Sequence, residues 1–102
     1  MSLLTPFEIV SEREGPGGWF FEVQIIGVPE GSLRTVTLAL SWPDYSHWTP
    51  DGADTASAVA EAVMGFLLER IAPDELPGRF DASLARRRFP DADERIPSLI
   101  RR

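Results

Sequence analysis

A chain of 102 residues, 43% of them hydrophobic, with a formal net charge of −6, fits one globular domain and excludes a disordered, highly charged segment. The absence of Cys excludes a disulfide framework, a thiolate nucleophile and a Cys-type zinc site. No apolar run approaches the roughly 18–20 residues that cross a bilayer, and the N-terminus lacks a signal-peptide pattern, so we expect a cytoplasmic protein without membrane contact.

The charge is divided unequally along the chain. Residues 1–78 hold twelve acidic residues and three Arg, a net charge of −9, whereas residues 79–102 carry a net charge of +3. A negative body disfavours general contact with nucleic acid or anionic membrane. We expect the basic segment to fold back onto the acidic body, with an acidic partner as the alternative. The basic residues are all Arg, which a GC-rich, bacterial-type genome explains.

Three strands are predicted in the first half of the chain, over about residues 7–12, 19–28 and 33–42. The second strand alternates most clearly, and its apolar face is made by Trp19, Phe21, Val23 and Ile25. Short turns rich in Gly and Pro connect the strands. Parallel pairing would need a crossover of a dozen or more residues, so we expect a three-stranded antiparallel meander.

One long helix is predicted over about residues 55–72, with Asp54 as its N-cap and Pro73 as the residue that stops it. Its apolar side chains form one broad stripe, made by Ala56, Val59, Ala60, Val63, Met64, Phe66, Leu67 and Ile71. We expect this stripe to cover the apolar face of the sheet. The predicted fold class is therefore α+β.

The C-terminal segment, residues 79–102, is predicted to pack on the core of residues 1–78 within a single domain. Residues 73–78 are composed like a linker, and Asp81 is suited to cap a short helix that ends at Arg88. After Pro90, we expect Ile96, Leu99 and Ile100 to dock as a tail.

The segment from Trp42 to Asp54 joins the third strand to the long helix. It contains two of the three Trp, the single Tyr and the single His. Aromatic side chains dominate interface hot spots, and loops between rigid elements often carry binding residues. We therefore predict a binding surface at Tyr45, His47 and Trp48. The alternative is that the Trp rings close the end of the core, which is favoured for Trp42 because it continues the core face of its strand.

His47 is also the candidate general base of a small enzyme, with Asp44, Asp51 or Asp54 as the group that orients it. No G-x-S-x-G nucleophile motif occurs, and we assign no catalytic residue. A single His without Cys excludes the usual zinc clusters, and no EF-hand spacing is present. We therefore expect neither a metal nor a cofactor, and the enzyme is the second alternative to a non-enzymatic domain.

Arg86, Arg87 and Arg88 form the strongest basic cluster and are the candidate contact with nucleic-acid phosphates. Cations are favoured at a helix C-terminus, and three acidic residues follow within residues 91–94. Pairing inside the chain is therefore the favoured interpretation, and a regulator linked to nucleic acid is the first alternative.

The strand–strand–strand–helix order resembles small antitoxin domains of the HicB type. The resemblance rests on the hairpin at residues 17–19 and on the helix start at residues 52–55. It implies an antitoxin-like regulator. The long third strand and the Arg-rich end depart from that pattern, and we do not assign the chain to the family.

The face of the predicted sheet that points away from the long helix is more apolar than a solvated face normally is. It carries Val10, Phe20, Ile26 and Leu33. Either the C-terminal segment or a second copy of the chain must cover it. The leading prediction is a protein-interaction domain, a homodimer, that uses this face or the aromatic segment.

Overall fold

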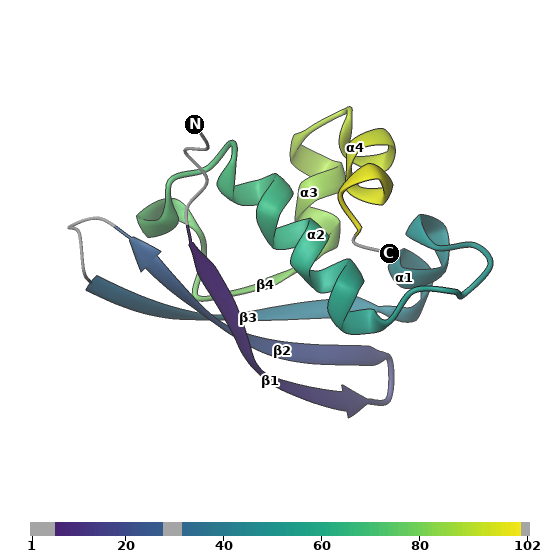
Figure 1. Cartoon of the computed structure of the whole chain (residues 1–102), viewed down its shortest axis with the longest axis horizontal. Coiled ribbons are helices and arrows are strands. Elements are labelled where there is room, and N and C mark those ends of the chain that lie inside the picture. Colours follow the sequence, from purple (N-terminus) through teal and green to yellow (C-terminus); the bar gives the residue numbers. More distant parts are fainter. Residues whose placement is uncertain (1–5, 28–31, 101–102) are drawn as a thin grey trace.

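The structure, a computed structural model, describes residues 6–27 and 32–100. Its elements are β1 (Phe7–Gly15), β2 (Gly18–Gly27), β3 (Ser32–Ser41), α1 (Trp42–Trp48), α2 (Ala56–Leu68), η1 (Pro73–Glu75), β4 (Arg79–Asp81), α3 (Ser83–Arg88) and α4 (Ala92–Leu99). The helices gather on one side of the sheet, with α2 lying across it (Figure 1). The α+β class is confirmed. Within the described ranges, no helix has the length and apolar character that crossing a membrane requires.

The sheet has four strands in the order β1-β2-β3-β4, so the predicted meander was incomplete. The first three strands pair antiparallel as predicted, whereas β4 pairs parallel with β3, placing Phe80 opposite Leu38. Only three residues form β4, too few to show an alternation, and the preceding Pro and Gly read as a linker. The fourth strand forms because Phe80 enters the core and the Ala82 N–H donates to the Ala39 carbonyl at 2.7 Å.

A β-bulge in β1 changes which side chains reach each face of the sheet. The pairing with β2 shifts between Ile9 and Ser11, so Val10 is the extra residue. Strict alternation from Ile9 would send Ser11 and Arg13 to the core side. The bulge instead places Arg13 opposite Phe20, on the face that points away from the helices.

The core lies between the sheet and α2. All eight side chains of the predicted helix stripe are buried, and they face buried residues of β2 and β3. Ala62 and Leu68, which lie outside that stripe, are also buried, and α4 packs against α2. The helix therefore contacts the sheet on one side and the C-terminal segment on another.

The ends of α2 differ from the prediction of residues 55–72. Thr55, not Asp54, is the N-cap, because its Oγ1 accepts from the Ala58 N–H at 3.0 Å. Both residue types suit a cap, and the one adjacent to the first helical residue takes the position. At the other end the Leu67 carbonyl accepts from Arg70 and Ile71, and the helix closes in a turn four residues early.

Residues 42–48 form a short helix, where the sequence predicted the end of the third strand at Trp42 followed by a loop. The Ser41 Oγ accepts from the Asp44 N–H at 3.2 Å, and Pro43 lies in the first turn, where its missing N–H is not needed. Because the strand ends at Ser41, Trp42 turns outward and is 45% exposed. The prediction that Trp42 extends the core was therefore wrong, whereas Trp48 closes the core and is 1% exposed.

The described part of the C-terminal segment forms two helices rather than one. Ala82, not Asp81, is the N-cap of α3, so the predicted cap was wrong, although Asp81 Oδ1 accepts from the Ser83 N–H at 2.9 Å. The second helix, α4, was not predicted, because Pro97 lies inside it. Ile96 and Ile100 are nevertheless buried, as expected of a docked tail.

Candidate functional site

The three aromatic-segment residues predicted as a binding surface do not share one. Trp48 is buried and donates its Nε1–H to Asp93 Oδ1 at 3.0 Å. Tyr45 is half-buried, and its hydroxyl donates to the backbone carbonyl of Asp54. Of the three, His47 alone is exposed. The exposed aromatic of this region is instead Trp42, whose ring packs on Trp19 with centroids 4.3 Å apart.

Asp93 is the centre of a polar cluster that joins α1, α3 and α4. Besides the bond from Trp48, it lies 3.2 Å from His47 Nε2 and 3.0 Å from Arg86 Nε. Arg86 also reaches the buried Asp44, with Nη1 3.2 Å from Oδ1. We call these five residues the Asp93 cluster. The predicted pairing of Arg86 within the chain is confirmed.

The environment of Asp93 favours its ionised form. Partial burial acts to raise the pKa of its carboxyl, but hydrogen bonds from Trp48 and His47 and the positive charge of Arg86 outweigh that effect. The pKa of Asp93 therefore lies below its ordinary value of 3.8. A carboxylate of this kind contributes to folding stability above that pH and loses its contribution as pH falls through the lower, folded-state pKa.

We therefore expect Asp93→Asn to lower the urea midpoint of unfolding near neutral pH, and the deficit to shrink as the pH falls below about 4. The measurement is urea denaturation of both proteins from about pH 7 to about pH 3. Glu94→Gln, at an exposed neighbour on the same helix, is the matched control. The expectation fails if the deficit of Asp93→Asn is independent of pH.

The hydrogen bonds and ion pairs of the Asp93 cluster link α1, α3 and α4. His47 has a carboxylate within reach, but that carboxylate is Asp93, not the Asp44, Asp51 or Asp54 considered from the sequence. The two oxygens of Asp93 are already engaged by Trp48, Arg86 and His47. Among residues 6–27 and 32–100, no group of three or more His, Asp or Glu side chains is arranged to hold a metal ion.

The three consecutive Arg residues do not act as one basic patch. Arg86 is engaged by Asp44 and Asp93, while Arg87 and Arg88 are exposed. The Arg88 guanidinium carbon lies 5.8 Å from the centre of the Phe89 ring. Two exposed Arg side chains therefore remain at the end of α3.

The outer face of the sheet, pointing away from the helices, is the larger candidate surface. None of the described helices covers it, because α3 and α4 lie on the same side as α2 (Figure 1). Of the two alternatives for covering this face, the C-terminal segment is therefore wrong for the part that is described. Ile26 and Leu33, which are direct cross-strand partners, are 44% and 64% exposed.

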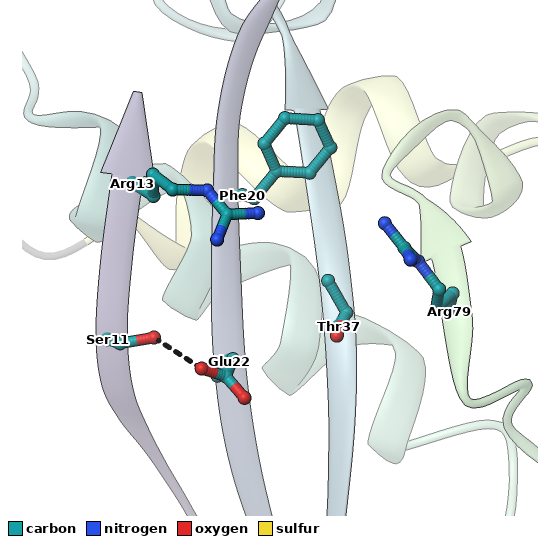
Figure 2. A pocket seen from close by; sticks show the side chains of 6 residues that line it. All are labelled: Ser11, Arg13, Phe20, Glu22, Thr37 and Arg79. Atoms are coloured by element: carbon teal, nitrogen blue, oxygen red, sulfur yellow. Dashed lines mark hydrogen bonds between the residues drawn. The ribbon is translucent and has the colours of Figure 1, made fainter. Parts of the chain in front are cut away.

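A groove of about 200 Å³ lies on this face and is lined by Ser11, Arg13, Phe20, Glu22, Thr37 and Arg79. We call it the outer groove. Figure 2 shows the Arg13 and Arg79 side chains extending over the sheet from opposite sides, with the Phe20 ring beside them. The Ser11 hydroxyl donates to Glu22 Oε1 at 3.1 Å.

The Phe20 ring is held in place from one side. The Arg13 guanidinium carbon lies 5.5 Å from the ring centre. A Cβ at Gly15 would come within 2.9 Å of the ring, so the glycine leaves the space that the ring occupies. The Phe20 ring therefore contacts Arg13 and occupies the space beside Gly15.

Sequence reasoning identified Phe20 on this face but not the two Arg side chains beside it. Arg13 reaches the outer groove only because of the bulge at Val10, and Arg79 only because β4 pairs with β3. Neither feature has a periodic signal in the sequence.

Comparisons of the chain with protein-family models, with curated proteins and with solved structures found no significant match.

Proposed function

We propose that the chain is a cytoplasmic, non-enzymatic protein-interaction domain that binds through the outer face of its sheet and forms a homodimer there. The observation that carries the proposal is a sheet face that none of the described helices covers (Figure 1) and on which Ile26 and Leu33 are exposed. Contiguous apolar surface of this kind marks protein–protein contacts. Both alternatives have less support, because Arg86 is engaged inside the chain and the oxygens of Asp93, the partner of His47, are engaged elsewhere.

The homodimer is proposed at one end of the outer face. Ile26 and Leu33 are exposed there and line a groove of about 240 Å³ together with Pro6, Phe7, Glu8 and Gln24. We call this region the apolar end. In a twofold dimer the same patch of both copies meets, so a patch that is apolar in one copy is matched by the other. Burying it removes apolar area from water at roughly 25 cal/mol per Å².

We expect the wild-type chain to sediment as a dimer at high micromolar concentration, and Leu33→Glu to sediment as a folded monomer that still unfolds cooperatively. The substitution introduces a charge that desolvation on dimerisation would penalise. Ser46→Glu, at an exposed position on α1, is the control and should remain dimeric. A monomeric wild type, or a Leu33→Glu variant that stays dimeric, contradicts the homodimer.

A further inference from the structure

Two unpaired cations share the outer groove. The guanidinium groups of Arg34, Arg70 and Arg86 are engaged by backbone carbonyls or carboxylates of the chain. In contrast, Arg13 and Arg79 form no ion pair with any acidic side chain of residues 6–27 and 32–100. Glu22 lines the same groove, but no ion pair joins its carboxylate to either of these two Arg side chains.

The size of the outer groove matches one side chain. Pockets for whole small molecules enclose roughly 300–1,000 Å³. At about 200 Å³ and with open sides, the outer groove is suited to a single group carried by a larger partner. The Phe20 ring and the Thr37 side chain supply apolar contact beside the two cations.

The charge of the groove favours one negative charge over several. Glu22 lines the same groove as the two Arg, which leaves a net charge of +1 among its lining residues. A carboxylate meets this balance and is recognised well by planar guanidinium groups. A run of phosphates would meet both Glu22 and the overall charge of −6, which disfavours nucleic acid.

We propose that the outer groove binds the carboxylate of a single Glu or Asp side chain in an extended, otherwise uncharged segment of a partner protein. Arg13 and Arg79 contact the carboxylate from its two sides. Phe20 packs on the aliphatic part of the same side chain or of a side chain two residues away in the segment. The cation–π contact of Arg13 with Phe20 lowers the loss of side-chain freedom on binding. The proposal rests on the protein-interaction function but not on the homodimer, whose contact lies at the other end of the strands.

The experiment measures fluorescence anisotropy of a labelled nine-residue peptide with one central glutamate among serine and threonine, titrated with the full chain at low salt. The expected result is binding that weakens with added salt, and that is at least about tenfold weaker for the twin peptide with glutamine in place of glutamate. Arg13→Gln and Arg79→Gln should each weaken binding about tenfold, as loss of an anchoring Arg does. Both side chains are exposed, so the melting temperature should not change.

Arg87→Gln is the matched control, because Arg87 is exposed, carries the same charge and lies on α3 rather than on the outer face. Binding of the acidic peptide should be unchanged in this variant. Equal loss in Arg87→Gln and Arg13→Gln would reduce the effect to net charge and overturn the proposal. So would equal affinity for the glutamine twin, or no binding at all.

Titration with a single-stranded oligouridylate of matched length tests whether the outer groove binds nucleic acid rather than a protein segment. Binding of this RNA more tightly than the acidic peptide, with loss in Arg13→Gln, would replace a protein ligand by a nucleic acid and overturn the proposal. The two proposals fail separately. If the chain is a dimer but does not bind the peptide, only the proposed groove ligand is contradicted. If a monomeric chain binds the peptide through Arg13, only the homodimer is contradicted.

Discussion

Leu67→Asp is expected to leave the domain unfolded at room temperature. The Leu67 side chain has no exposed area and lies at the centre of the α2 stripe. Truncating such a residue to Ala already costs about 2–5 kcal/mol, and an ionised carboxylate without a partner costs more. Because the total stability of a domain is only about 5–15 kcal/mol, the substitution removes most or all of it.

Circular dichroism and a thermal melt provide the measurement for Leu67→Asp. Glu61→Asp introduces the same side chain on the exposed side of the same helix and should change stability by less than about 0.5 kcal/mol. A cooperative melt of Leu67→Asp within a few degrees of wild type would mean that α2 does not present this face to the sheet.

Trp48→Ala is expected to destabilise the domain by about 3–5 kcal/mol, through loss of a large buried side chain. Trp48 is 1% exposed, and its indole N–H is bonded to Asp93, so the truncation also frees part of the Asp93 cluster. Trp48→Phe should cost less, because it keeps most of the buried area and loses only the hydrogen bond to Asp93. Urea denaturation at neutral pH measures both variants.

Trp42→Ala is the matched control for Trp48→Ala. The Trp42 ring is 45% exposed and packs on Trp19, a contact worth about 0.5–1.5 kcal/mol beyond its buried area. The two Trp residues at the two ends of α1 should therefore differ clearly in their effect on stability. Equal losses would contradict the burial difference. Because Trp48→Ala is expected to lose much of its folding stability, a binding defect in this variant would result from unfolding and not from loss of a binding residue.

The elements with a long periodic pattern could be predicted from the sequence. In β2 the alternation places Phe21, Val23 and Ile25 in the core, and in α2 the stripe ends at Ile71, which is buried although the helix closes before it. Periodicity carries this information because one buried face repeats every two residues in a strand and every 3.6 in a helix. It does not locate the ends, which depend on single hydrogen bonds such as that of Thr55.

The candidate site was much less predictable. Tyr45, His47 and Trp48 are neighbours in sequence, yet the short helix α1 places the Trp48 ring in the core and leaves the His47 ring exposed. Asp93 lies 45 residues beyond Trp48, and no local pattern indicates that it accepts the indole N–H. Arg13 and Arg79 are equally remote from each other, and each is ordinary in its own segment.

By itself, the sequence determined the α+β class, the three antiparallel strands, the core faces of β2 and α2, and an apolar outer face, because these follow from spacing within one element. Only the tertiary structure decided that β4 joins the sheet, that Trp48 rather than Trp42 closes the core, and that two cations flank Phe20. These outcomes depend on a one-residue bulge, on the residue at which a strand ends and on contacts between distant segments. Each is set by how the elements meet in space.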